Sequence, residues 1–135
     1  MIYYFQILRP WTDLMAAITE NELEKHVRQF LKEFKSLVDQ NGLIVKDRQK
    51  NQNSLLEMGL TARQRKDIIL SLSVQDYCDG PRDDKYEPGQ LWIFGKHVDG
   101  EEVYIKLKIA ESRGEEYAVC FSFHKSESPL SYPFS

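Results

Sequence analysis

Residues 91–125 decide the fold, and they read LWIFGKHVDGEEVYIKLKIAESRGEEYAVCFSFHK. Apolar and polar residues alternate in three runs separated by two turns, which is typical of antiparallel strands with one buried face. In the middle run, the expected buried face consists of Val103, Ile105, Leu107 and Ile109. The expected open face consists of Tyr104, Lys106 and Lys108.

The third run predicts the neighbouring strand. Its apolar row consists of Val119, Phe121 and Phe123, and its opposite row consists of Ala118, Cys120, Ser122 and His124. If residues 110–116 form the hairpin loop and Ile109 faces Tyr117, the register pairs are Lys106 with Cys120, Tyr104 with Ser122 and Glu102 with His124. Diagonal neighbours on one sheet face are within reach of long side chains. We therefore expect one surface that carries Tyr104, Lys106, Ser122 and His124.

This surface combines groups that can carry acid–base chemistry. The imidazole of His124 can exchange protons near neutral pH, and the ammonium group of Lys106 can stabilise a developing anion. Tyr104 and Ser122 add two hydroxyl groups. An ordinary exposed sheet face also collects such residues, so periodicity alone leaves a structural interpretation open.

Length and composition indicate one globular domain. A chain of 135 residues can bury most of its unfolded surface without crosslinks. A net charge of −3 argues against nucleic-acid binding by bulk charge, but it leaves room for a local basic patch. Cys78 and Cys120 lack metal-binding or disulfide spacing, so we expect reduced thiols, a cytoplasmic location, no metal and no cofactor.

The N-terminal part divides into an arm and a helix. Residues 1–18 lack the features of a signal peptide or membrane anchor, so we expect an arm or extension before a single domain of residues 19–135. The arm could be an edge strand, a partner contact or an extended start. A capping box from Thr19 to Glu22 predicts a helix over about residues 20–40, ended by Gly42.

Shorter elements are expected between this helix and the sheet. The pattern predicts a strand at residues 43–45, a helix at 52–58 and another helix opened by a capping box at Thr61. Residues 73–90 contain Gly-Pro and Pro-Gly pairs and five acidic residues, and they predict a long loop without the spacing of a calcium site.

Asp99-Gly100 predicts a hairpin turn, but its length is open. A strict two-residue turn would place Ile93 opposite Lys106. A longer loop would place Trp92 and Lys96 on the polar face.

Five short motifs occur in order along residues 43–125: Leu70-Ser71-Leu72-Ser73, Asp76-Tyr77, Leu91-Trp92, Val103-Tyr104-Ile105-Lys106 and Phe121-Ser122-Phe123. In this order and spacing the chain resembles the MqsR family of type II toxin–antitoxin toxins. The resemblance is closest to a branch with a Ser-Phe-His element and a Tyr-Pro-Phe tail, here residues 122–124 and 132–134.

The resemblance implies an α+β, RelE-like fold with N-terminal helices packed on a small, mainly antiparallel sheet. It also implies a metal-independent endoribonuclease that cleaves mRNA through attack of a 2′-hydroxyl group. A cognate antitoxin that binds DNA would be the partner, with a possible hetero-oligomer and no membrane association.

The family's motif residues are only partly present. Tyr104 and Lys106 match its tyrosine and lysine, whereas the lysine that follows Ser-Phe is His124 here. Its glutamine after tryptophan is Ile93, and a lysine expected soon after the Asp-Tyr pair is Asp79.

The resulting site hypothesis gives each residue a role. His124 would be the general acid or base, Lys106 would stabilise the phosphorane with help from Lys96 or Lys125, and Tyr104 would orient the phosphate or share in proton transfer. Trp92 or Tyr77 could stack a base, although Trp92 could equally be core. The expected RNA-binding residues are Lys125, Lys108, Tyr77, Trp92 and Ser122.

Two other functional classes remain open from the sequence. The acidic net charge and the two replaced polar groups are compatible with a non-catalytic interaction module, such as a degenerate toxin that serves as an antitoxin-binding or repressor subunit. An unrelated α+β ligand-binding domain is a third reading, against which the lysines of residues 96–125 argue.

Overall fold

The computed structural model describes the backbone of residues 10–135 and the side chains of residues 22–135. The first helix, α1, spans Pro10–Asn41, so its predicted start near Glu20 is wrong. Proline is compatible with the first turn of a helix, because that turn does not use its missing N–H group. The predicted end is confirmed, since Gly42 has a φ of +83° and its N–H donates to Val38. Residues 1–9 of the expected arm lie outside the described part.

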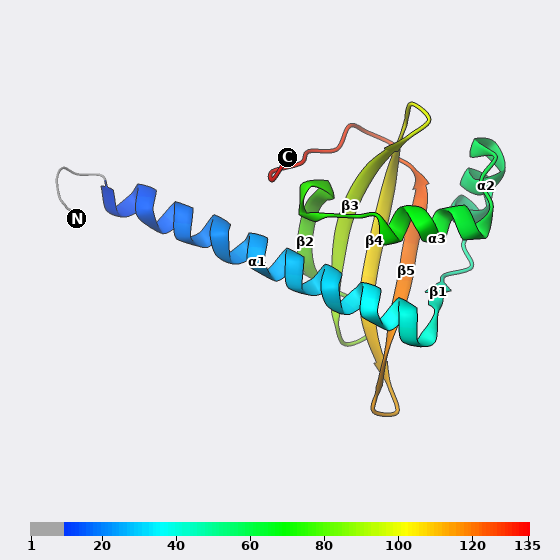
Figure 1. Ribbon diagram of the computed structural model, residues 1–135, viewed down its shortest axis with the longest axis horizontal. Coiled ribbons are helices and arrows are strands. Elements are labelled where there is room, and N and C mark those ends of the chain that lie inside the picture. The colour runs from blue at the N-terminus through cyan, green and yellow to red at the C-terminus, as the bar shows by residue number, and fades with distance from the viewer. Residues whose placement is uncertain (1–9) are drawn as a thin grey trace.

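Eight further elements follow α1: β1 (Leu43–Val45), α2 (Gln49–Met58), α3 (Ala62–Leu70), the 3-10 helix η1 (Val74–Asp76), β2 (Tyr77–Asp83), β3 (Gln90–Val98), β4 (Glu101–Ser112) and β5 (Glu115–Lys125). The strands form one sheet in the order β1-β5-β4-β3-β2. β1 is parallel to β5, and the other pairs are antiparallel. The predicted α+β class, with N-terminal helices on a mainly antiparallel sheet, is confirmed (Figure 1).

Both hairpins close through two-residue turns. Asp99 and Gly100 have φ values of +50° and +82°, and Arg113 and Gly114 have +53° and +80°. Such left-handed pairs match the twist of the adjoining strands. The first turn sets Ile93 opposite Lys106, which resolves the register that the sequence left open. The second turn is shorter than the loop predicted over residues 110–116, because β4 continues to Ser112.

The long loop predicted for residues 73–90 is wrong. Most of it is η1 and β2, and only residues 84–89 connect β2 to β3. β2 is an edge strand with two register shifts against β3. A proline such as Pro81 is tolerated there, because an edge strand leaves one row of backbone donors unpaired.

α1 and α3 pack on one face of the sheet and form the core there, whereas α2 lies at the edge of the sheet beside β5 (Figure 1). α1 contributes Val27, Phe30, Leu31, Phe34 and Val38. The facing sheet residues include Trp92, Phe94, Val103, Ile105, Leu107, Ala118, Cys120 and Phe123. Phe30 stacks on Trp92 with ring centroids 4.9 Å apart. Among the described residues, none of the helices has the length and apolarity needed to cross a membrane.

A β-bulge in β5 changes the register predicted from the sequence. Leu107 pairs with Cys120 and Lys106 pairs with Ser122, so Phe121 is an extra residue between the two pairs. A bulge shifts the alternation of the strand by one residue. The predicted pairs of Lys106 with Cys120, Tyr104 with Ser122 and Glu102 with His124 are wrong, first because the tighter hairpin pairs Ile109 with Ala118 in place of Tyr117, and then because of the bulge. Val119 and Phe121 lie on the open face, whereas Ala118 and Cys120, predicted there, lie in the core.

Candidate functional site

A pocket of about 350 Å³ lies on the sheet face opposite the core. Its floor comes from the middle of β4 and the end of β5, and the bulge turns Ser122 and His124 to the side of Tyr104 and Lys106. The lining residues are Arg48, Lys50, Tyr104, Lys106, Ser122, His124, Ser126, Glu127, Ser128 and Leu130. The four residues that the sequence places on one surface are thus brought together here, although through a different register.

A buried asparagine fixes the start of α2 beside this floor. The side chain of Asn51 donates to the carbonyl oxygen of Phe121 at 3.2 Å and accepts from the N–H group of Phe123 at 2.9 Å. Ser54 accepts from the N–H group of Lys125 at 3.1 Å. α2 therefore continues the edge pairing that β1 begins on β5, and its first turn brings Arg48 and Lys50 to the pocket.

His124 presents one ring nitrogen for chemistry. Its Nδ1 lies 2.9 Å from the carbonyl oxygen of Lys125. Because a carbonyl oxygen only accepts hydrogen bonds, this contact assigns the proton of the neutral imidazole to Nδ1 and leaves the lone pair on Nε2. The ring also stacks on Tyr104, with centroids 5.3 Å apart and planes 17° apart. Its orientation is therefore fixed from two sides.

Lys106 lies in a cationic environment. Burial in the first place, followed by the positive charges of Arg48 and Arg82, lowers the pKa of its amino group. Its Nζ lies 5.9 Å from the centre of the Tyr104 ring. Several positive charges close together, partly shielded from water, create a local potential that attracts an anion such as a phosphate group.

Tyr104 is held in its protonated form. Burial raises the pKa of its phenol, the nearby Arg82 opposes this effect, and Asp79 and Cys78 add to it. The phenol can therefore donate a hydrogen bond or a proton at neutral pH. Ser122 is 2% exposed, so its hydroxyl lies at the bottom of the pocket.

The bulged Phe121 lies beside the pocket under three cations. Its ring centre is 5.2 Å from Nζ of Lys46, 5.6 Å from Cζ of Arg48 and 5.7 Å from Nζ of Lys108. Cations at this distance interact favourably with the face of an aromatic ring. The ring helps to hold Arg48 at the edge of the pocket.

Two lysines expected in the site lie elsewhere. Lys96 is opposite the core residue Val103 in the β3–β4 ladder, and its Nζ lies 3.2 Å from a carboxylate oxygen of Asp76. Lys125 lines a separate pocket, 3.9 Å from both Glu57 and Glu101. Neither lysine lines the pocket of His124.

Four of the five expected RNA contacts are buried: Ser122 at the bottom of the pocket, and three others that do not line it. Tyr77 and Trp92 are core residues, 4% and 8% exposed, and they cannot stack on a base in this arrangement. Lys108 is on the open face but is 2% exposed, because it binds Asp84 at 2.7 Å. This ion pair fastens the β2–β3 connection to the sheet.

The two positions at which the chain lacks the family's polar residues also lie near the open face. Ile93 is buried opposite Lys106, and Asp79 forms an ion pair with Arg82. Sequence reasoning missed Arg48 and Lys50, which lie between the predicted strand at residues 43–45 and the predicted helix at residues 52–58. The signal was the β-strand at residues 43–45, because its parallel pairing with β5 places the following residues beside the end of β5.

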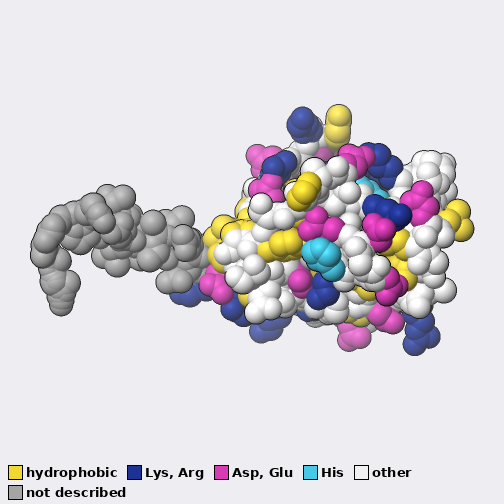
Figure 2. Space-filling view, turned by 90° about the horizontal axis from the view of Figure 1, so that it is seen from above, with side chains coloured by type: hydrophobic (Ala, Val, Ile, Leu, Met, Phe, Trp, Pro, Cys, Tyr) yellow, Lys and Arg dark blue, Asp and Glu magenta, His cyan; other side chains and the backbone are white. Residues whose placement is uncertain are grey.

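The basic character of the pocket is local. The face shown in Figure 2 carries Lys and Arg side chains interspersed with Asp and Glu side chains, in line with the net charge of −3. Within the described residues, no group of three or more His, Cys, Asp or Glu side chains is arranged to hold a metal ion.

Comparison with protein families gave one match. The family model described as motility quorum-sensing regulator, toxin of MqsA, matches residues 26–125, from the middle of α1 to the end of β5. All of the strands and the floor of the pocket lie within this range, and the tail after β5 lies beyond it. Searches of curated proteins and of solved structures gave no significant match.

Proposed function

The chain belongs to the MqsR toxin family, and from this premise we propose that it is a metal-independent endoribonuclease that cleaves mRNA. Membership of the family makes the protein a toxin of a toxin–antitoxin system with an antitoxin partner. The observation that carries the proposed activity is the pocket in which His124, Tyr104 and Lys106 line one space with Arg48.

The proposed reaction is transfer of a phosphoryl group within the RNA. The 2′-oxygen attacks the adjacent phosphorus atom while its proton passes to a base, and the bond to the 5′-oxygen breaks as that oxygen gains a proton. The products are a 2′,3′-cyclic phosphate and a free 5′-hydroxyl group. Water and metal ions are not needed as reactants in this step.

His124 is the general base in this proposal. Its Nε2 carries the lone pair, because Nδ1 is engaged with the carbonyl oxygen of Lys125. Proton transfer by a positioned side chain contributes about 10²–10⁴-fold to a rate. Tyr104 is stacked against the same ring and retains its proton, so it can donate to the leaving 5′-oxygen or to the phosphate.

Lys106 and Arg48 stabilise the charge that develops on the phosphorane. Both side chains line the pocket, so their charges can act on one phosphate group there. A preorganised charge donor at a developing anion contributes about 10²–10³-fold to a rate. The deeply placed Ser122 hydroxyl can hydrogen-bond to the phosphate or the ribose.

The antitoxin completes the proposal. We expect it to neutralise the toxin and to bind DNA, forming a hetero-oligomer with this chain. A non-catalytic interaction module would bind the antitoxin equally well, so antitoxin binding alone does not distinguish the two functions.

The test is incubation of the purified protein with a defined single-stranded RNA in EDTA, followed by mapping of the new ends. Fragments with 2′,3′-cyclic phosphate that are absent with His124→Ala are the expected result. His26→Ala is the matched control, because His26 is exposed on α1 and does not line the pocket. Cleavage retained by His124→Ala would refute the assignment of the base.

A growth assay covers cleavage that requires the ribosome. Expression of the toxin alone should arrest growth, and His124→Ala should be tolerated. If the wild-type protein neither cleaves free RNA nor arrests growth, the interaction module is the better description.

A further inference from the structure

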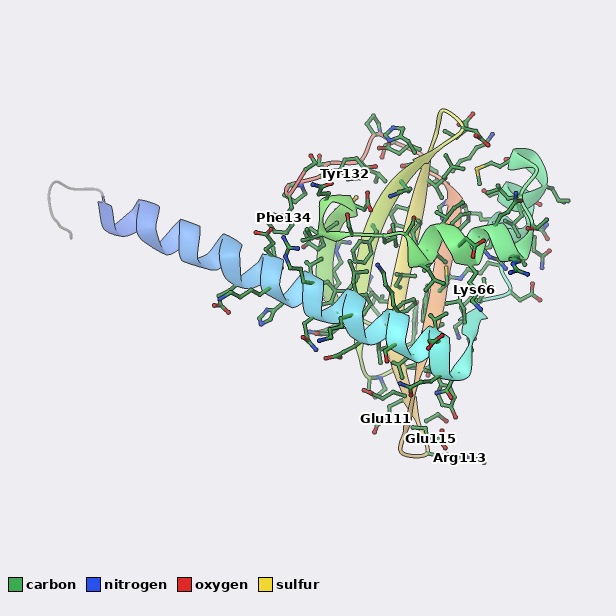
Figure 3. All side chains as sticks on the ribbon, in the orientation of Figure 1. Lys66, Glu111, Arg113, Glu115, Tyr132 and Phe134 are labelled. Carbon is green, nitrogen blue, oxygen red and sulfur yellow. The ribbon has the colours of Figure 1, made fainter. Side chains whose placement is uncertain are left out.

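The chain after β5 folds back over the sheet and borders the pocket. Residues 126–135 lie beyond the matched family range, yet Ser126, Glu127, Ser128 and Leu130 are among the pocket-lining residues. Figure 3 shows that the tail runs from the end of β5 toward β2 and β3, and that Tyr132 and Phe134 lie beside these two strands. The tail is thus a part of this chain that shapes the proposed RNA site.

Glu102 holds the tail in place. The N–H group of Leu130 donates to one carboxylate oxygen at 3.0 Å, and the hydroxyl of Tyr132 donates to the other at 2.7 Å. The N–H group of Ser126 donates to the backbone oxygen of Glu102 at 2.8 Å. One residue of β4 therefore fastens the tail at three points.

Packing supports these hydrogen bonds. The ring of Phe134 stacks on Tyr77 with centroids 5.4 Å apart. Gly95, which is opposite Tyr104 in the β3–β4 ladder, leaves room for Leu130 and Tyr132, and a Cβ atom there would collide with both. The tail therefore packs closely against β3 at Gly95, next to Tyr104 of the pocket floor, and this packing indicates a fixed position for the tail.

The two borders of the pocket differ in chemistry. The border from the start of α2 is cationic, with Arg48 and Lys50, and suits phosphate groups. The tail border offers the hydroxyl-bearing Ser126 and Ser128, the carboxylate of Glu127 and the apolar side chain of Leu130. Lys50 and Glu127 join the two borders through an ion pair at 2.6 Å.

From this difference we propose that residues 126–130 form the base-reading wall of the RNA pocket. The tail wall carries no cation and one carboxylate, so it is unsuited to phosphate. Unpaired RNA bases are recognised by hydrogen bonds to their edges and by contact with their faces, which serine hydroxyls and a leucine side chain provide. The inference rests on the proposed ribonuclease function and deepens it, because it names the part of the site that selects the nucleotide.

The experiment measures cleavage of a random-sequence RNA pool and maps the bases on both sides of each cut. Leu130→Ala and Ser128→Ala are compared with the wild-type protein, with Leu56→Ala as a control in a leucine that is 81% exposed on α2. We expect the preference for one base at a position beside the cut to fall by about 10-fold in Leu130→Ala. This is the lower end of the loss of discrimination that follows removal of a close apolar contact. Leu56→Ala should leave the preference unchanged.

Arg48→Met provides the contrast at the phosphate-binding border. It should weaken binding of all sequences alike and reduce the slope of log affinity against log salt by about one. Leu130→Ala should leave this slope unchanged. A change in the slope with no change in base preference in Leu130→Ala would overturn the proposal.

The remaining outcomes are also decisive. If Leu130→Ala does not fold, Tyr132→Phe carries the test, because it removes the hydrogen bond to Glu102 and keeps the ring. Cleavage with wild-type preferences in all of the tail variants would overturn base reading by the tail and leave the ribonuclease function intact. If the wild-type protein neither cleaves this pool nor arrests growth, the ribonuclease function and base reading are refuted together.

Discussion

The two faces of the sheet are built from the same strands but by different means. On the face under the helices, apolar side chains of β3, β4 and β5 pack against α1 and form the core. On the open face, polar and charged side chains meet the start of α2 and the C-terminal tail around a pocket. The core face requires only apolar character and volume, whereas the pocket requires particular groups at particular distances. We therefore expect substitutions that keep apolar character and volume to be tolerated in the core, and substitutions in the pocket to be tolerated less.

Phe123 and Phe121 test this comparison most directly, because they are two residues apart in one strand. Phe123 is fully buried in the core, and Phe121 lies on the open face under three cations. Phe123→Ala should lower the free energy of unfolding by about 3–5 kcal/mol, measured by denaturant unfolding. Phe121→Ala should cost clearly less. Equal losses would mean that the alternation is uninterrupted and that the bulge is absent.

A pair of lysines on opposite faces sharpens the functional side of the comparison. Lys106→Met removes a charge from the pocket and should lower the rate of RNA cleavage by about 10²–10³-fold. Lys96→Met removes a charge that pairs with Asp76 on the helix-covered face and should leave cleavage per folded molecule close to wild type. Initial rates and circular dichroism of both variants provide the measurement. A larger effect for Lys96→Met would contradict the site described above.

Asn51 links the edge of the sheet to the open face. Asn51→Ala would leave the backbone groups of Phe121 and Phe123 without their side-chain partner, at a cost of about 1–3 kcal/mol. It should also lower cleavage, because Arg48 and Lys50 would lose their fixed position beside His124. Asn53→Ala, at an exposed position of the same helix, is the control for both measurements. If Asn51→Ala is less stable but cleaves RNA at the wild-type rate, the position of α2 does not matter for cleavage.

The smallest expected effect concerns acid stability. The hydrogen bond from Lys108 lowers the pKa of Asp84 from 3.8 to about 2. A carboxyl group whose pKa is depressed in the folded state stabilises the fold above its unfolded pKa, and this contribution is lost as the pH falls toward about 2. Asp84→Asn should therefore be less stable than wild type above pH 3.8, and the difference should shrink below it. Thermal unfolding of wild type and Asp84→Asn between pH 2 and 6, with Asp83→Asn as the control, measures the difference in stability. A difference that does not change with pH would exclude the Asp84–Lys108 ion pair as its origin.

Local patterns identified much of the fold before the structure. The alternation of β4, the capping box at Thr61 and the helix stop at Gly42 are all present as predicted. These signals depend on neighbours within four residues or on strict alternation, so they can be read along the chain. The start of α1 was misjudged because a strong capping motif at Thr19 can also sit inside a longer helix.

The candidate site was only partly predictable. Tyr104, Lys106, Ser122 and His124 come from two adjoining strands, and alternation within each strand predicted that they share a surface. The bulge in β5 is what turns Ser122 and His124 to that side. The positions of Arg48, Lys50 and the tail depend on contacts between segments that are more than 20 residues apart in the chain, such as Asn51 with Phe123 and Glu102 with Tyr132. No local pattern records such contacts.

Local sequence patterns were enough to predict the α+β class, the apolar face of β4 and the family, and they placed the four residues of the proposed catalytic group on one surface. The pairing of β5, the burial of Tyr77, Trp92 and Lys108, and the positions of Lys96 and Lys125 outside the pocket became apparent in the folded structure alone. A single bulge moves the side chains that follow it to the other face of the sheet, and the composition of the strand does not reveal this change. A charge or an aromatic ring then acquires its role from the segments that pack around it.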